Sequence, residues 1–439
     1  MTSEHTYDAL VIGDGPAGDA AARKMGSAGL HVALVEAAEL GGECLNSGCV
    51  PSKALLALTS RERRPWDEVV ARVRAVQLLT RGSDPDGGFA EAGVDLYRGA
   101  ARFLGPNEVA VGETVLRAPH VVIATGTAPA IPPIPGLAEA NPLTNRTVFS
   151  IPSLPGRLAV IGGGAIGLEL GQAFHRLGVE VTIFEVLDRV AASEEPEVSA
   201  ELERVLQAAG VRVETGIRIE RAARQEGGRV ALWTDGRRWE FDEVLVAAGR
   251  SPQLPEGLDR LGLALDQRGF IETSACGETN LPGVWAAGDV TGGLQFTHYA
   301  SLQGHHVARH IIAGECEPRP APVGVWAIFR EPEVGHAGLT EGEARRSGRT
   351  VRTARLDARE LDWFRASGST IGFAKVVADA ATGRLLGAHL LCERASDLAG
   401  EAALAIQCGL TAREVAAAVH PYPTAAELFR WACAQVSHG

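Results

Sequence analysis

Two short apolar segments of this 439-residue chain each run directly into a glycine-rich turn. They are Leu10–Gly18 and Ala159–Gly167, and both contain the pattern Gly-x-Gly-x-x-Gly. A helical stretch follows each turn, and then a second apolar strand with an acid at its end, Glu36 in the first unit and Glu185 in the second. This internal near-repeat of strand, turn, helix and strand predicts two βαβ units, each part of a parallel sheet.

The acid lies 23 residues after the first glycine in both units, at 36 after 13 and at 185 after 162, which is typical of a dinucleotide-binding turn. The first glycine permits the tight turn, the second lets the backbone approach a pyrophosphate, and the third lets helix and strand pack closely. The helix N-terminus offers N–H donors, and the acid accepts hydrogen bonds from a ribose. The predicted binding residues are Gly13, Gly15, Gly18 and Glu36, and Gly162, Gly164, Gly167 and Glu185.

Asp14 lies inside the first glycine-rich turn. Its negative charge would oppose a pyrophosphate bound there. We therefore expect the Asp14 side chain to point toward solvent.

The last 120 or so residues have a different pattern, with short alternating strands and amphipathic helices. We expect strands at Gly372–Ala378 and Leu385–Leu391, and helices at Ser396–Gln407 and Ala425–Val436. This part reads as a separate α+β module, and the length of the chain allows about three domains.

Composition narrows the class of protein. A formal charge of −12 argues against nucleic acid or an anionic membrane as a partner. No apolar run is long enough to span a bilayer, and the polar start Met1–Asp8 shows no signal peptide. Seven scattered cysteines do not form a secreted disulfide framework, so we expect a cytoplasmic protein. We expect Cys276, Cys316, Cys392, Cys408 and Cys433 to be buried or incidental thiols.

The other two cysteines, Cys44 and Cys49, lie in the segment Gly41–Lys53, shortly after the first βαβ unit. A thiol pair there can pass electrons between a bound flavin and an outside substrate. A helix predicted from about Pro51 would lower a nearby thiol pKa. A static disulfide or a metal pair is the alternative, although no further ligands lie at the spacing that zinc needs.

The segment Gly41–Lys53, with its Gly-Gly start and Pro-Ser-Lys end, resembles the redox-active disulfide of the class I pyridine nucleotide–disulfide oxidoreductases. The resemblance implies an α/β fold with two Rossmann-like dinucleotide-binding domains, as in glutathione reductase, plus a C-terminal α+β dimerisation domain. The implied bounds are 1–146 for the FAD-binding domain with the redox disulfide, 147–265 for the NAD(P)-binding domain, 266–318 for the second FAD-binding part, and 319–439 for the interface domain.

The resemblance also implies roles for single residues. Cys49 would face the flavin and Cys44 would exchange with substrate, while Lys53 would approach the flavin and pair with Glu169. His420 and Glu427 match a His-x-x-Pro-Thr-x-x-Glu stretch, in which a histidine oriented by the glutamate acts in the other subunit of a homodimer. The further cofactor-binding residues would be Gly42, Thr125, Gly126, Gly249, Gly288 and Asp289.

The cofactors implied are FAD in the first unit and NAD in the second. Glu185 favours NADH over NADPH, because a carboxylate there would repel a 2′-phosphate. We expect a small dithiol or disulfide as substrate, as in dihydrolipoyl dehydrogenase.

A mercuric-reductase-like metal reductase, a glutathione-reductase-like enzyme and a flavin redox sensor with little turnover remain open alternatives. Against the metal reductase, only Cys433 lies near the C-terminus, where that enzyme has a vicinal pair. We expect no resident metal, and we interpret the histidines between 298 and 310 as ordinary helix residues.

Overall fold

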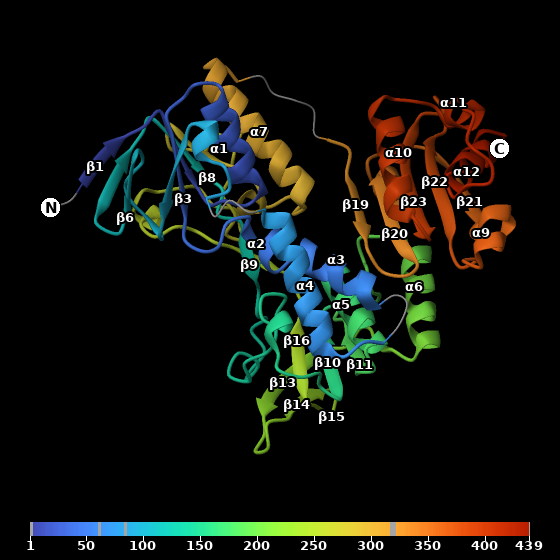
Figure 1. Cartoon of the computed structure of the whole chain (residues 1–439). Coiled ribbons are helices and arrows are strands. Elements are labelled where there is room, and N and C mark those ends of the chain that lie inside the picture. Colours follow the sequence, from blue (N-terminus) through green and yellow to red (C-terminus); the bar gives the residue numbers. More distant parts are fainter. Residues whose placement is uncertain (1–2, 60–62, 83–85, 317–321, 439) are drawn as a thin grey trace.

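A computed structural model of the chain describes residues 3–59, 63–82, 86–316 and 322–438. Figure 1 shows three domains. The first combines an N-terminal segment with a later segment that ends near residue 316, the second lies below it in this view, and the C-terminal domain lies to the side. Among the helices in these ranges, none combines the length and apolar character needed to cross a membrane.

The first domain is built on a five-stranded parallel sheet of order β18-β8-β2-β3-β4. Its strands are β2 (Ala9–Ile12), β3 (Val32–Glu36), β4 (Val94–Arg98), β8 (His120–Ile123) and β18 (Val284–Ala286). A second sheet of order β1-β7-β6-β5 contains β1 (Ser3–Thr6), β5 (Ala101–Gly105), β6 (Glu108–Val111) and β7 (Thr114–Arg117). Helices α1 (Pro16–Ser27) and α7 (Thr297–Ala313) pack against each other.

Strand β2 shows why its sequence is apolar without alternation. Ala9 and Val11 belong to the core that includes α1 and α7, whereas Leu10 and Ile12 belong to the core shared with the second sheet. Successive side chains of a strand point to opposite faces, so a strand covered on both sides needs apolar residues throughout.

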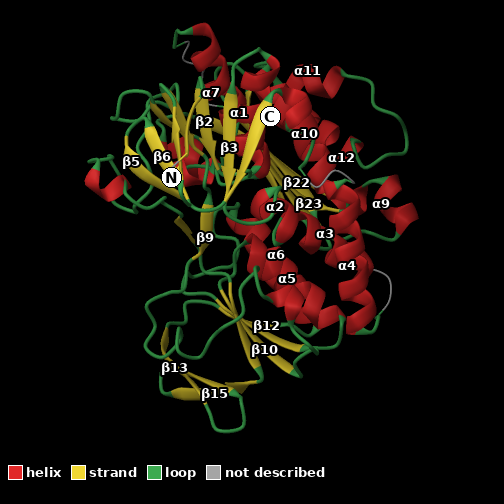
Figure 2. Cartoon of the chain, turned by 60° about the vertical axis from the view of Figure 1, so that its left-hand side comes forward, coloured by secondary structure: helices red, strands yellow, loops and turns green. Residues whose placement is uncertain are grey.

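The second domain repeats the same architecture with a parallel sheet of order β12-β11-β10-β16. Its elements are β10 (Arg157–Ile161), β11 (Glu180–Phe184), β12 (Arg212–Glu214), β16 (Glu243–Val246), α5 (Ala165–Arg176) and α6 (Pro196–Ala209). An antiparallel sheet adds β13 (Ile219–Arg224), β14 (Val230–Thr234) and β15 (Arg237–Phe241). A two-stranded ribbon of β9 (Thr127–Pro129) and β17 (Arg250–Pro252) lies where the chain passes between the two nucleotide-binding domains (Figure 2).

The C-terminal domain is a five-stranded antiparallel sheet of order β19-β20-β23-β22-β21, which confirms the α+β prediction. The strands are β19 (Val325–Ile328), β20 (Glu333–Gly338), β21 (Val351–Asp357), β22 (Phe373–Asp379) and β23 (Leu385–Cys392). The helices are α8 (Glu341–Arg346), α9 (Asp362–Ser367), α10 (Ala395–Gln407), α11 (Ala412–Ala417) and α12 (Glu427–His438). The last helix begins two residues later than expected.

The C-terminal sheet contacts the second domain through a row of basic side chains. His336, His389 and Lys375 are cross-strand neighbours on β20, β23 and β22. The Lys375 ammonium donates to the carboxylates of Glu195 and Glu197, at 3.0 and 2.8 Å. Because these acids flank the start of α6, this row fixes the second domain against the C-terminal one.

Glu194, His336 and His389 form a buried group whose donor atoms could hold a metal ion. Glu194 accepts from Trp326 at 2.6 Å and lies 2.9 Å from His336 Nδ1. The other ring nitrogen of His336 lies 2.9 Å from the Gly338 carbonyl oxygen. His389 Nε2 lies 3.0 Å from the Leu339 carbonyl oxygen, while its Nδ1 is buried without a hydrogen-bond partner in the described part of the chain. Burial lowers the pKa of His389 to about 4, so that side chain is neutral at physiological pH. Because Glu194 precedes α6 of the second domain and His336 is on β20 of the C-terminal domain, the group joins these two domains.

Two cysteines expected to be incidental thiols are joined. Cys276 and Cys316 form a disulfide with a Cα–Cα distance of 5.8 Å, within the usual range for such a bond. Cys276 is buried in the core beside α7, and Cys316 follows the end of that helix. The prediction was wrong for this pair because residues 40 apart in sequence give no local signal of contact. Cys392 and Cys433 are buried thiols, and Cys408 is exposed.

We predict that Cys316→Ser lowers the stability of the protein in non-reducing buffer by about 2–4 kcal/mol, because it opens a closed loop. Thermal unfolding with and without dithiothreitol measures this, and the reductant should remove the difference from the wild type. Cys408→Ser, which removes an exposed free thiol, is the matched control. Equal melting temperatures for both variants in non-reducing buffer would contradict the prediction.

Candidate active site

The two predicted redox cysteines lie at adjoining helix ends. Cys44 is in the short helix α2 (Gly42–Asn46), and Cys49 opens helix α3 (Cys49–Thr59), which leads to α4 (Trp66–Arg81). The structure holds them as two free thiols. Cys49 Sγ also lies 3.4 Å from the hydroxyl of Thr297, the first residue of α7. Two helix N-termini therefore meet at Cys49.

The surroundings of the two thiols shift their pKa values in opposite directions. A hydrogen bond from Cys44 lowers the pKa of Cys49, and Thr297 and the Lys53 charge lower it further against the opposing effect of burial. The same hydrogen bond, together with burial, raises the pKa of Cys44. The pair is therefore arranged to hold a thiolate at Cys49 and a protonated thiol at Cys44.

Lys53 and Glu169 meet as expected, with the ammonium 2.7 Å from the carboxylate. Only 5% of the Glu169 side chain is exposed, and its second oxygen accepts from the backbone N–H of Phe329 at 2.8 Å. The ammonium also lies 4.5 Å from the centre of the Phe329 ring. Since Glu169 is on α5 and Phe329 follows β19, this ion pair lies where the three domains meet.

Both glycine-rich turns have the shape that a pyrophosphate requires. Gly13, the first glycine, has a positive φ that disfavours a side chain. At Gly18, the third glycine, a side chain would clash with the backbone of Gly13. Gly162 and Gly167 show the same two constraints. A side chain at the second glycines, Gly15 and Gly164, would meet no protein atom, so this side of each turn is open to a ligand. Each open turn begins a helix, α1 or α5.

The two acids, Glu36 and Glu185, lie beside these turns. Glu36 accepts from the backbone N–H of Asp14, and Glu185 from that of Gly163, both at 2.7 Å. The residues therefore fit FAD and NAD(P) in the two domains, with each acid placed next to the turn.

Asp14 does not point toward solvent as expected, because it is only 2% exposed. Its carboxylate accepts from the N–H of Gly41 at 2.8 Å, while its second oxygen is buried without a protein partner. Burial raises the pKa of Asp14 to about 7. Charge repulsion alone predicts an exposed side chain, whereas the folded chain supplies the Gly41 N–H as a buried partner.

The remaining predicted cofactor residues surround the same region. Gly42 packs so closely on Gly15 that a side chain would come within 2.7 Å of its Cα, and Gly288 packs against α1. Asp289 accepts from Thr127 at 3.3 Å, and burial raises its pKa. Thr125, Gly126 and Gly249 lie beside the ribbon: Thr125 donates to the Gln253 carbonyl, and the two glycines adopt positive φ and face open space.

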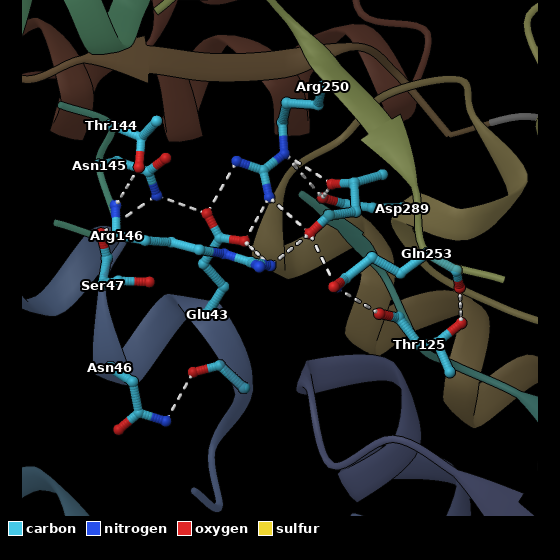
Figure 3. Close-up of polar contacts among 12 residues, drawn as sticks. Glu43, Asn46, Ser47, Thr125, Thr144, Asn145, Arg146, Arg250, Gln253 and Asp289 are labelled. Carbon is cyan, nitrogen blue, oxygen red and sulfur yellow. Dashed lines mark hydrogen bonds and ion pairs between the residues drawn. The ribbon is translucent and has the colours of Figure 1, made fainter. Parts of the chain in front are cut away.

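One cluster at this site had no signal in the sequence analysis. Glu43, next to Cys44, accepts hydrogen bonds from Arg250, Arg146 and Asn145 (Figure 3). Residues more than 100 positions apart meet here, so only the folded chain shows the cluster.

His420 has a partner other than the expected Glu427. Its Nε2 lies 2.8 Å from the carboxylate of Glu401 on α10, and its Nδ1 lies 3.1 Å from the Ala418 carbonyl oxygen. Glu427 instead accepts from the backbone N–H of Thr424 at 3.3 Å. The sequence spacing missed Glu401 because α10 comes beside this segment only in the tertiary structure.

Comparisons with known proteins agree with this geometry. A family model described as pyridine nucleotide-disulphide oxidoreductase matches residues 7–304, and the dimerisation domain of the same family matches residues 325–433. The chain belongs to the pyridine nucleotide-disulphide oxidoreductase family. It is therefore an FAD-dependent oxidoreductase with the glutathione-reductase fold, and its cofactors are FAD and NAD(P).

Proteins with two different activities are similar in sequence to nearly the whole of this chain. A dihydrolipoyl dehydrogenase of Thermus scotoductus is 37% identical over 96% of this chain and 95% of its own. A mercuric reductase of Streptomyces lividans is 36% identical over 98% of this chain and 97% of its own. The structure of the HOCl-induced flavoprotein disulfide reductase RclA from Escherichia coli superposes with a TM-score of 0.91 at 27% identity, covering 98% of this chain and all of that one.

We predict that Cys49 remains reactive in mildly acidic solution, because a lowered pKa keeps its thiolate present below the range of an ordinary thiol. The rate of alkylation by iodoacetamide, followed between pH 5 and 9 in the reduced protein, gives the midpoint. Lys53→Met should move this midpoint upward, since it removes a cation that favours the thiolate. Lys24→Met, on the far end of α1, is the control, and an unchanged midpoint in the Lys53 variant would contradict the prediction.

Proposed function

We propose that this protein is an NADH-dependent disulfide oxidoreductase of the dihydrolipoyl dehydrogenase kind, acting in the cytoplasm through a redox-active pair Cys44–Cys49. The observation that carries the proposal is the placement of the two thiols: Cys49 opens α3 with the Thr297 hydroxyl 3.4 Å from its sulfur, and Cys44 lies beside it in α2. These surroundings lower the pKa of Cys49 and raise that of Cys44. One thiol is suited to face an electron acceptor and the other to exchange with a substrate.

The chain's residues divide the work as follows. Bound FAD would supply the exchange of two electrons between nicotinamide and thiols. The turns at Gly13–Gly18 and Gly162–Gly167 would hold the two dinucleotides, and Lys53, fixed by Glu169, places a cation next to Cys49. With its proton taken by His420 of the partner subunit, Cys44 would attack a substrate disulfide and form a mixed disulfide, releasing one substrate sulfur as a thiolate. The Cys49 thiolate would then attack the Cys44 sulfur, which releases the second substrate sulfur and closes the Cys44–Cys49 disulfide. Overall, NADH, a proton and a disulfide give NAD⁺ and a dithiol, or the reverse.

The preference for NADH rests on Glu185. Its two oxygens accept from the backbone N–H groups of Gly163 and Leu187, which fixes the carboxylate beside the second turn. A fixed carboxylate accepts hydrogen bonds from a ribose 2′-hydroxyl and repels a 2′-phosphate.

The site residues and domain bounds 1–146, 147–265, 266–318 and 319–439 remain predictions of this proposal. So does a homodimer in which His420 serves the other subunit. The dimerisation domain supports the dimer. His420 would have to leave Glu401 to act across it, since only 9% of its side chain is exposed. Tyr422, two residues on, is 71% exposed.

Mercury(II) reduction is the second candidate, and the similarity to mercuric reductases over nearly the full length favours keeping it. Cys433 does not support it, because that thiol is completely buried in the C-terminal core. A sensor that is reduced once and then stops would show no sustained turnover with any disulfide.

We predict that anaerobic NADH reduces the flavin of the purified protein and that NADPH does so at least tenfold less efficiently. Dihydrolipoamide with NAD⁺, glutathione disulfide and Hg²⁺ are then compared as substrates under steady-state conditions. Cys44→Ser should retain flavin reduction by NADH and lose turnover with disulfides. If the variant loses flavin reduction as well, or turns over disulfides normally, the proposed role of the pair is wrong.

A second prediction tests whether His420 acts in the active site of the partner subunit. His420→Gln should lower turnover with dihydrolipoamide on the order of 10²-fold, the usual effect of losing a general base, and Tyr422→Phe should have little effect. Mixing inactive Cys44→Ser and His420→Gln subunits should restore activity, because one site of each mixed dimer is then complete. A larger loss in the Tyr422 variant would assign the role to the phenol, and no recovery on mixing would exclude supply by the partner.

A further inference from the structure

The carboxylate of Glu43 accepts hydrogen bonds from three side chains, and two of these are arginines. Two guanidinium nitrogens of Arg250 donate to the two carboxylate oxygens of Glu43, at 2.9 and 2.6 Å, and one nitrogen of Arg146 donates at 3.1 Å. The amide of Asn145 donates to the same carboxylate (Figure 3). The side chains of Glu43 and Arg250 are 18% and 17% exposed, so both partners of this bidentate pair are largely removed from water.

The pair connects two functionally different parts of the chain. Glu43 directly precedes Cys44 in the first turn of α2. Arg250 opens β17 in the ribbon between the nucleotide-binding domains, directly after Gly249. Arg146 donates to the Thr127 carbonyl on the other ribbon strand, at 3.1 Å, as well as to Glu43. The redox helix is therefore attached to the ribbon by its acid.

Electrostatics makes this attachment firm. Burial alone would raise the pKa of Glu43, but the hydrogen bonds and charge of Arg250, with Asn145 and Arg146, outweigh it and leave that pKa below its ordinary value. Glu43 is thus a carboxylate at neutral pH. Bidentate arginine–carboxylate pairs fix relative orientation as well as distance.

We propose that Glu43 and Arg250 are a positioning pair that sets the orientation of the exchange thiol Cys44 relative to the ribbon between the two nucleotide-binding domains. The inference rests on the proposed function, because it assigns the pair to the thiol-exchange step. Neither side chain reacts; both act through the placement of α2.

Helix α2 has other supports that keep it folded without the pair. The Asn46 amide donates to the carbonyls of Leu40 and Gly42 at 3.0 and 2.9 Å, and Gly42 packs on the first phosphate turn. Loss of the Glu43 charge therefore loosens the direction of α2 without removing the helix. It also removes a negative charge from the residue next to Cys44, which favours the thiolate of Cys44, while Arg250 keeps the carboxylate of Asp289 at 3.9 Å.

The test compares Glu43→Gln, Arg250→Lys and the double variant with the wild type, all as FAD-loaded protein. We expect Glu43→Gln to alkylate at Cys44 on the order of tenfold faster with iodoacetamide, yet to turn over disulfide on the order of tenfold more slowly. Flavin reduction by NADH should stay within about threefold of the wild type. The double variant should lose no more turnover than the worse single variant, because a broken pair cannot be broken again.

Two controls separate positioning from general damage. Glu108→Gln makes the same chemical change in an exposed ion pair with Arg117 on the outer sheet of the first domain, and it should leave both rates unchanged. Alkylation of the buried Cys433 reports any wider unfolding.

Opposite movements of Cys44 reactivity and turnover support the pair. Unchanged rates in Glu43→Gln, or parallel losses with exposure of Cys433, overturn it. A wild type without disulfide turnover would instead reject the proposed function, and the alkylation rates would still report whether the pair holds Cys44.

Discussion

The buried carboxylate of Glu169 is the contact on which the site depends. It binds the Lys53 ammonium of the redox helix with one oxygen and the Phe329 backbone N–H of the C-terminal domain with the other. A buried carboxylate that lost these partners would be strongly destabilising. The three domains must therefore meet in one arrangement, and that arrangement places Lys53 beside Cys49.

Around this point the redox segment is held from several directions. Gly42 packs on Gly15 of the first phosphate turn, so the position of the thiols follows the position of the nucleotide-binding turn. Glu43 ties the same segment to the ribbon between the two nucleotide-binding domains. The thiols and the nucleotide-binding turns are thus connected by direct contacts, which suits a protein that must bring two cofactors and a substrate to one place.

The C-terminal domain contributes through polar contacts as well as through its core. The row of His336, His389 and Lys375 faces the acids at the start of α6, and α6 is the helix that follows β11 and Glu185 in the chain. The second nucleotide-binding domain and the C-terminal domain, which matches the family's dimerisation domain, are therefore in direct contact here. The His420 segment lies in the same domain, where Glu401 rather than Glu427 holds the imidazole.

The sequence by itself determined the parts that depend on short spacing. Gly-x-Gly-x-x-Gly followed by an acid, and Cys44 with Cys49, are local patterns whose backbone conformation is set by neighbouring residues. Only the tertiary structure decided the burial of Asp14, the Cys276–Cys316 bond, the partner of His420 and the Glu43–Arg250 pair. Each of these joins residues from separate elements, and a contact of that kind depends on how the domains pack, which no local pattern records.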